Sequence, residues 1–99
     1  MNRLTQDNEG LARLCRRYHI RRLSLYGSVL KGDARPDSDV DLLVEFDQGK
    51  APGLLGIAEI EAELSCLLGG RKVDLRTEHD LSPCFRKEVK DSAEVQYAA

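Results

Sequence analysis

The sequence lacks a long apolar run and a strong basic charge, and each absence excludes a class of protein. No apolar stretch approaches the ~20 residues that a helix needs to cross a membrane. The net charge is −2, whereas a domain with a large nucleic-acid footprint is usually strongly basic. We therefore expect no membrane span and no direct binding to nucleic acid.

The sequence also lacks paired cysteines. Cys15, Cys66 and Cys84 lie far apart and show neither a CxxC pair nor the Cys/His spacing of a metal site. Cys15 and Cys66 fall within helical apolar patterns, so we expect both to be reduced thiols of the core. The first residues, MNRLTQDNEG, are polar and acidic, unlike a secretory signal or a transit peptide. A reducing, cytoplasmic location is the simplest expectation.

The composition that is present fits one small globular domain. The chain has 99 residues, of which 41% are hydrophobic and 32% charged, and it shows no repeat or interior linker. We therefore expect a single domain over residues 1–99. Apolar periodicity predicts helices and strands that alternate as α-β-α-β-α-β-α-(β), over about 6–19, 21–26, 28–33, 39–46, 54–68, 71–76, 82–91 and 94–97.

This order predicts an α/β domain of the α+β type, with three to four strands in one small sheet and about four helices. The connection between the first two strands has 12 residues at most. That length suits either a parallel or an antiparallel pair, so the spacing leaves the strand directions open.

One strand carries alternating acidic and apolar residues. Because successive side chains of a strand point to opposite faces, Asp39 and Asp41 share one face, about 6.6 Å apart at roughly 3.3 Å per residue. The other face is apolar and consists of Val40, Leu42, Val44 and Phe46. Neighbouring carboxylates repel each other, and a hard cation such as Mg²⁺ would relieve that repulsion.

A third carboxylate follows the same pattern. Asp74 lies between Val73 and Leu75, so it also occupies the polar face of a strand whose other face is apolar. If the two strands are neighbours, Asp39, Asp41 and Asp74 converge in an arrangement suited to metal-assisted nucleotidyl transfer. The alternative is three solvent-facing carboxylates on a half-exposed sheet.

A Gly-Ser pair follows the first strand. Gly27 permits a tight turn and the close approach of a ligand to the backbone. Ser28 would begin a helix, where free N–H groups favour a bound phosphate. The alternative is an ordinary serine N-cap.

Together these motifs resemble a known signature. Gly27-Ser28, ten residues and then Asp39-Val40-Asp41 resemble the signature of the DNA polymerase β-like nucleotidyltransferase superfamily. The stretch GSVLKGDARPDSDVDLLVEF is similar to its minimal nucleotidyltransferases (MNT), which are often encoded beside a HEPN-domain toxin. The segment GLLGIAEIEAELSCLLGGRKVDLRTEHDLSP extends the resemblance to nearly the whole chain from about residue 20. The resemblance implies a mixed sheet and the polymerase β-like fold.

The resemblance also implies roles for individual residues. Gly27 and Ser28 would hold the triphosphate of ATP. Asp39 and Asp41 would ligate one or two Mg²⁺ ions, and Asp74 would complete the site by ligating the metal and helping to activate the acceptor hydroxyl. The implied activity is AMP transfer from ATP to a hydroxyl, a tyrosine in this family, of a cognate HEPN toxin, which silences the toxin.

Two matters stay open at this stage. The alternative function is a non-catalytic antitoxin that sequesters its partner and holds nucleotide or metal without turnover. Lys31 and Arg35 lie near the predicted phosphate site, and His79 follows the third strand. For Lys31 a solvated charge is the favoured interpretation. His19 and His79 are poor candidates for chemistry, and the alternative for His79 is a contact with substrate or partner.

Overall fold

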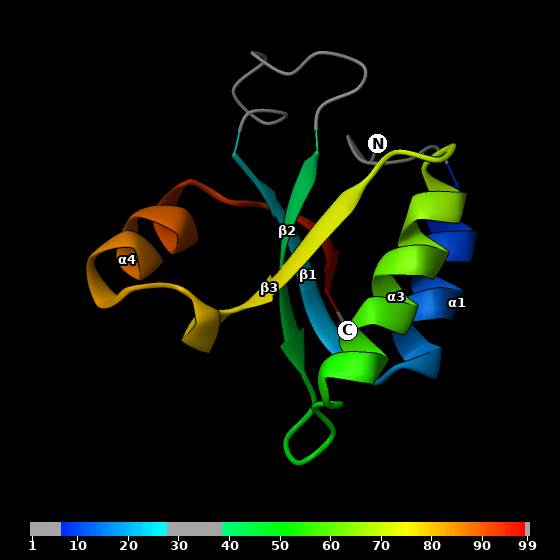
Figure 1. Ribbon diagram of the computed structural model, residues 1–99, viewed down its shortest axis with the longest axis horizontal. Helices are drawn as coiled ribbons and strands as arrows, with labels where there is room; N and C mark the ends of the chain where they lie inside the picture. Colours follow the sequence, from blue (N-terminus) through cyan, green and yellow to red (C-terminus); the bar gives the residue numbers. More distant parts are fainter. Residues whose placement is uncertain (1–6, 28–38, 99) are drawn as a thin grey trace.

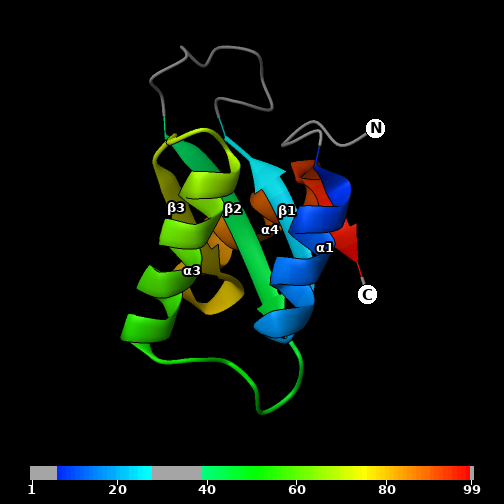
Figure 2. The same ribbon diagram turned by 90° about the vertical axis from the view of Figure 1, so that its right-hand side faces the viewer.

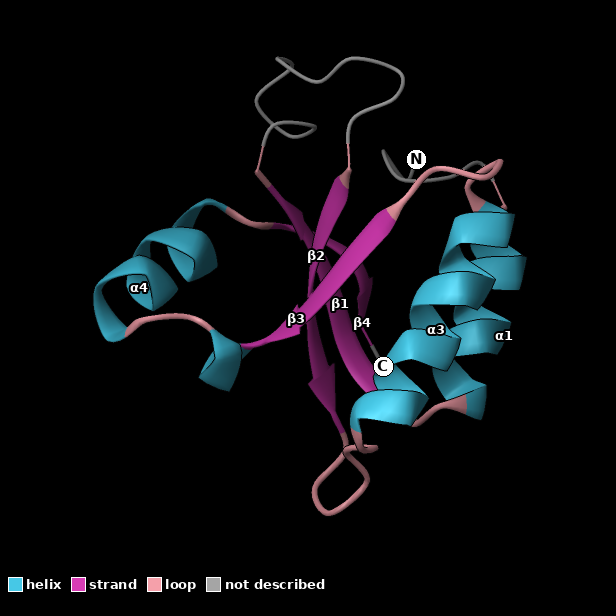
Figure 3. Cartoon of the chain, viewed as in Figure 1, coloured by secondary structure: helices cyan, strands magenta, loops and turns pink. Residues whose placement is uncertain are grey.

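The computed structural model describes residues 7–27 and 39–98, and this part of the chain folds into three α-helices and one four-stranded sheet (Figures 1 and 3). The elements in chain order are α1 (Asn8–Arg17), β1 (Ile20–Tyr26), β2 (Val40–Phe46), α3 (Leu54–Leu67), β3 (Val73–Thr77), the 3-10 helix η1 (Glu78–Asp80), α4 (Pro83–Ser92) and β4 (Glu94–Ala98). The predicted elements recur with small shifts at their ends. The short helix predicted over 28–33 lies outside the described residues.

The elements form three layers. Helices α1 and α3 lie side by side over one face of the sheet, and α4 covers the other face (Figures 1 and 2). None of the helices in the described ranges combines the length and the apolar character needed to cross a bilayer.

The sheet is mixed, as the resemblance implied. Its strand order is β3-β2-β1-β4; β1 pairs antiparallel with both β2 and β4, while β2 and β3 are parallel. Helix α3 supplies the crossover that a parallel pair requires. The strand directions that spacing left open are thereby decided, and the predicted last strand is confirmed as β4.

The predicted apolar face of β2 is confirmed. Val40, Leu42 and Val44 are buried in the main core against α1 and α3. The opposite face differs from the expectation of a polar surface, because Leu43 is buried there in a second cluster with Tyr26, Leu81 and Val89. Helix α4 excludes water from this face, so its carboxylates lie beside an apolar patch.

Local capping residues determine where the helices begin and end. Asp7 caps α1 by accepting a hydrogen bond from Gly10 N at 2.9 Å. After α3, Gly69 and Gly70 adopt positive φ angles of 75° and 91°, as the Gly-Gly pair predicted. Ser82 caps α4, with Pro83 at its first position. Capping thus fixes where α4 begins, and α4 borders the site described below.

One cysteine prediction is wrong. Cys15 is buried as expected, but Cys66 is exposed, and so is Cys84. Cys66 lies two residues after the buried Leu64, which rotates it by about 200° around the helix axis at 3.6 residues per turn. It therefore faces away from the sheet, although it belongs to an apolar stretch.

Candidate active site

Two of the predicted carboxylates are direct neighbours across parallel strands. Asp41 of β2 lies opposite Asp74 of β3 in the strand register, and both are partly buried. Asp39 immediately precedes β2 and is exposed. The crossover through α3 thus brings Asp74 beside Asp41 although they are far apart in the sequence.

The carboxyl group of Asp41 is influenced by the charges around it. The pKa of Asp41 is raised, first by burial and then by the negative charges of Asp74 and Asp39, while Arg76 opposes the shift. A carboxyl group that is both desolvated and near like charges holds its negative charge at a cost. This corner of the sheet therefore favours the binding of a cation.

Arg76 is a functional candidate that the sequence prediction missed. Its Nε donates a hydrogen bond to Asp74 Oδ2 at 3.2 Å, and this ion pair raises the pKa of Arg76. Asp74 and Arg76 are two positions apart on one strand, so both side chains share a face. That spacing was a signal available in the sequence. Arg76 partly neutralises the acidic corner.

Gly27 lies against the acidic strand. It directly follows β1, and Tyr26 is the register partner of Asp41. The φ angle of Gly27 is 84°, and a Cβ at this position would lie only 2.4 Å from Asp41 Oδ2. The Asp41 carboxylate therefore lies against the backbone of Gly27, and the approach of a ligand there stays a prediction. Ser28, Lys31 and Arg35 lie outside the described residues.

Asp41 and Asp74 line a hollow of about 380 Å³ between the sheet and the start of α4. Tyr26 is a buried part of its lining, and burial and the charge of Asp41 raise the pKa of the Tyr26 hydroxyl. The complete lining is Tyr26, Asp41, Asp74, Arg76, Asp80, Leu81, Ser82 and Phe85. The sequence prediction missed Phe85, since a single aromatic near a helix start carries no distinctive signal.

The histidines lie away from this hollow. His19 is exposed at the turn after α1 and has a φ angle of 59°. His79 is exposed in η1 and lines a different depression, beside the loop after β2. Neither histidine lines the space next to Asp41 and Asp74.

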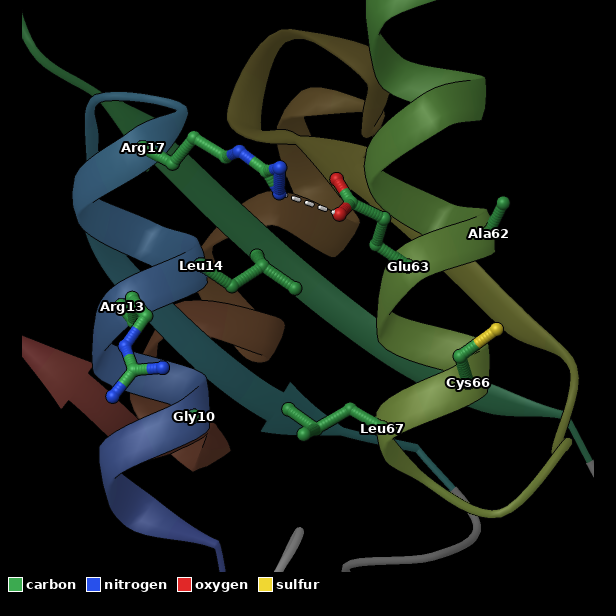
Figure 4. Close-up of a pocket in the computed structure, with 8 residues that line it drawn as sticks. All are labelled: Gly10, Arg13, Leu14, Arg17, Ala62, Glu63, Cys66 and Leu67. Carbon is green, nitrogen blue, oxygen red and sulfur yellow. Dashed lines mark hydrogen bonds and ion pairs between the residues drawn. The ribbon is translucent and has the colours of Figure 1, made fainter.

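A larger hollow lies on the opposite face of the molecule. It measures about 920 Å³ and separates α1 from α3 (Figure 4). Arg17 of α1 donates to Glu63 of α3 at 2.7 Å across it, and Tyr18 also donates to Glu63. This hollow holds no paired carboxylates, so its residues lack the chemistry of the β2–β3 corner.

The donor atoms of the acidic corner suit a hard cation. Carboxylate oxygens are the ligands that Mg²⁺ prefers, and the mutual repulsion around Asp41 would fall when a cation binds. Among the residues that the structure describes, no group of three or more His, Cys, Asp or Glu side chains is gathered tightly enough to form a metal centre. The ion pair with Arg76 engages Asp74 instead.

Comparison with known proteins agrees with this geometry. The family model of the nucleotidyltransferase domain matches residues 8–95. The protein adenylyltransferase MntA of Thermococcus cleftensis is 41% identical over 73 residues, covering 74% of this chain and 71% of that protein. A solved structure assigned as a minimal nucleotidyltransferase is 41% identical, with a TM-score of 0.71 over 87% of this chain and 85% of its own.

A further structural match concerns the fold alone. The crystal structure of a toxin–antitoxin with AMP-PNP has a TM-score of 0.74 and 19% identity, covering 94% of this chain and 74% of that one. The predicted polymerase β-like fold, with its mixed sheet, is confirmed. The match of the family model over most of the chain shows that this protein belongs to the nucleotidyltransferase domain family.

Proposed function

We propose that this chain is an antitoxin that transfers AMP from ATP to a hydroxyl, preferentially of tyrosine, of a cognate HEPN-domain toxin and so neutralises it. The observation that carries the proposal is the pairing of Asp41 with Asp74 in register, beside Gly27. The name of the Thermococcus relative, a protein adenylyltransferase, supports the same chemistry. The site of action would be the cytoplasm, where ATP and the toxin are present.

In the proposed site, Gly27 and Ser28 hold the triphosphate. Positive φ at Gly27 and the absence of a Cβ let the turn lie against the Asp41 carboxylate, which would place a triphosphate held by the turn beside the carboxylates. Asp39, Asp41 and Asp74 would hold one or two Mg²⁺ ions, which when bound neutralise charge on the phosphate oxygens. The whole activity would belong to one domain over residues 1–99, with the acceptor supplied by the toxin.

The proposed reaction is an in-line displacement at the α-phosphorus. The acceptor oxygen bonds to phosphorus, the bond from phosphorus to the bridging oxygen breaks, and pyrophosphate leaves with that electron pair. Asp74 accepts the proton of the hydroxyl and returns it to water. Tyr26 and Leu81 exclude water from one side of the carboxylates, which strengthens their electrostatic effect.

Intact mass spectrometry of the toxin tests the proposal. After incubation with this chain, ATP and Mg²⁺, the toxin should gain the mass of one or more AMP units. The Asp39→Asn, Asp41→Asn double variant should abolish the gain. Glu45→Gln is the matched control, because Glu45 lies on the same strand and pairs with Arg22 instead.

Two outcomes would count against the proposal. An unchanged toxin mass with every nucleotide tried would refute the transferase activity. If the double variant protected cells from the toxin as well as the unmodified chain does, neutralisation would rest on sequestration of the partner without turnover.

A further inference from the structure

Three adjacent strands contribute groups to the site in a fixed row. Gly27 follows β1, Asp41 belongs to β2 and Asp74 belongs to β3, and these strands are consecutive in the sheet. Gly27 and Asp74 therefore lie on opposite sides of Asp41. Any ligand that spans the carboxylates has one end toward β1 and the other toward β3.

The row gives a direction to the proposed reaction, on which this inference rests. In an in-line displacement the entering and leaving oxygens lie on opposite sides of the phosphorus. If pyrophosphate leaves on the side of Gly27, the acceptor oxygen enters on the side of Asp74. The acceptor then approaches over β3, the edge strand of the sheet.

The chain that continues from β3 through η1 into the first turn of α4 lines much of the hollow, with Asp80, Ser82 and Phe85 among the lining residues. Phe85 lines the same hollow as Asp41 and Asp74, and 45% of its surface is exposed. Most large apolar side chains of the described region are buried, including Val89 one turn further along α4. Phe85 thus presents a partly exposed apolar ring in a hollow that also contains four charged side chains, and burying that ring against a partner would be favourable.

The backbone holds Phe85 firmly in this position. Phe85 N donates to Ser82 Oγ at 3.4 Å in the N-cap of α4. The guanidinium of Arg86 donates to the carbonyl oxygens of Glu78 at 2.9 Å and Leu81 at 3.2 Å, which ties α4 to η1. A side chain on such a braced turn can bind a partner with little loss of backbone conformational entropy.

We infer that Phe85 is an acceptor-binding residue that packs against the aromatic ring of the tyrosine whose hydroxyl receives AMP. Aromatic rings prefer offset or edge-to-face packing at centroid distances of about 4.5–7 Å. A tyrosine packed in this way extends its hydroxyl beyond the ring, toward the carboxylates. Serine and threonine lack the ring, so Phe85 also selects the class of acceptor.

The test compares Phe85→Ala and Phe85→Leu with Val95→Ala. Val95 is a matched control because it is 52% exposed but lies on β4, at the opposite edge of the sheet. Phe85→Ala should raise the KM for the toxin by about 10-fold, since an aromatic pair and its buried area are lost. The KM of Phe85→Leu should lie between those of Phe85→Ala and the unmodified chain. The KM of Val95→Ala should equal that of the unmodified chain.

Two binding measurements accompany the kinetics. Calorimetry with a non-hydrolysable ATP analogue should give the same Kd for all variants, and the Kd of the toxin should rise about 10-fold for Phe85→Ala. A weaker analogue Kd with an unchanged KM for the toxin would overturn the inference, because the ring would then contact the adenine base.

The experiment separates this inference from the proposed function. Transfer by all variants with an unchanged KM and toxin Kd would overturn the role of Phe85 while leaving the transferase intact. No transfer by the unmodified chain, with a toxin Kd that still rises for Phe85→Ala, would refute the transferase and support the contact. Melting curves check that each variant folds.

Discussion

Gly27 lies so close to Asp41 that a Cβ on residue 27 would be 2.4 Å from Asp41 Oδ2. This distance is far below any real contact of a Cβ, so any larger residue at position 27 would force the Asp41 side chain to move. The same glycine has a positive φ angle, which other residues rarely adopt. Two independent constraints thus act on one residue of the proposed triphosphate site.

Gly27→Ala should disturb the site by more than backbone strain alone. Gly49→Ala is the matched control, because Gly49 also has a positive φ, of 75°, but a Cβ there would meet nothing within 4 Å. We expect the free energy of unfolding, measured with urea, to fall by about 1 kcal/mol for Gly49→Ala and by about 2–3 kcal/mol for Gly27→Ala. Binding of an ATP analogue should weaken only for Gly27→Ala. Equal losses in both variants would show that Asp41 moves aside freely.

Arg76→Met should make the chain more responsive to Mg²⁺. Arg76 pairs with Asp74, so the substitution makes the Asp74 carboxylate available to Mg²⁺. When Mg²⁺ is absent, the neighbouring charges of Asp41 and Asp74 then lack a neutralising cation. Without metal, we expect the free energy of unfolding to fall by about 0.5–1 kcal/mol relative to the unmodified chain. On addition of Mg²⁺, the Tm of the variant should rise more than the Tm of the unmodified chain.

The control for this variant is Arg22→Met. The ion pair of Arg22 with Glu45, at 3.5 Å, is exposed to a similar degree, with 49% and 29% of the two side chains accessible against 48% and 35% for Arg76 and Asp74. Its removal should leave the Mg²⁺ response unchanged. If both variants respond to Mg²⁺ like the unmodified chain, Arg76 does not compete with the ion.

Asp80 should contribute stability that depends on pH. Its carboxylate accepts hydrogen bonds from Thr77 N and Thr77 Oγ1, both at 3.0 Å, and these bonds lower its pKa. A folded-state pKa below the unfolded value means that the contribution is complete above the unfolded value and disappears as pH falls through the folded one.

Asp80→Asn should therefore be less stable than the unmodified chain at pH 7, by about 0.5–1 kcal/mol, as expected for an exposed cap. The difference should vanish at acidic pH. The measurement is denaturant unfolding of both chains from roughly pH 2 to pH 7, which spans the titration of an aspartate. A difference that stays constant with pH would contradict the role of the charge. Glu59→Gln, on the exposed side of α3, serves as a control for loss of one negative charge.

Thiol alkylation should distinguish Cys15 from the other two cysteines. Burial raises the pKa of Cys15 to about 12, so its thiolate is scarce at neutral pH, whereas Cys66 and Cys84 are exposed. Iodoacetamide should add two groups to the native chain within the time that adds three to the unfolded chain, as read by intact mass. Rapid addition of a third group to the native chain would show that the α1 side of the core opens.

The site was predictable where it depends on local pattern. Alternation placed Asp41 and Asp74 on polar strand faces, and the Gly-Ser spacing pointed to the turn at Gly27. The roles assigned to Gly27, Ser28, Asp39, Asp41 and Asp74 all stay predictions. Arg76 was missed although its spacing from Asp74 places both on one strand face, and Phe85 was missed because a phenylalanine near a helix start acquires meaning only beside the carboxylates. Cys66 was placed wrongly because an apolar stretch does not tell which side of a helix faces the core.

The sequence by itself determined the order of elements, the apolar face of β2 and the chemical identity of the carboxylates, because these follow from side-chain periodicity and capping between near neighbours. Only the tertiary structure decided that β2 runs parallel to β3, which sets Asp41 beside Asp74, and that α4 folds back to bury Leu43 and bring Phe85 to the site. Those arrangements depend on contacts between segments that are distant in the sequence. Such contacts are stabilised because apolar surface on both faces of the sheet is removed from water.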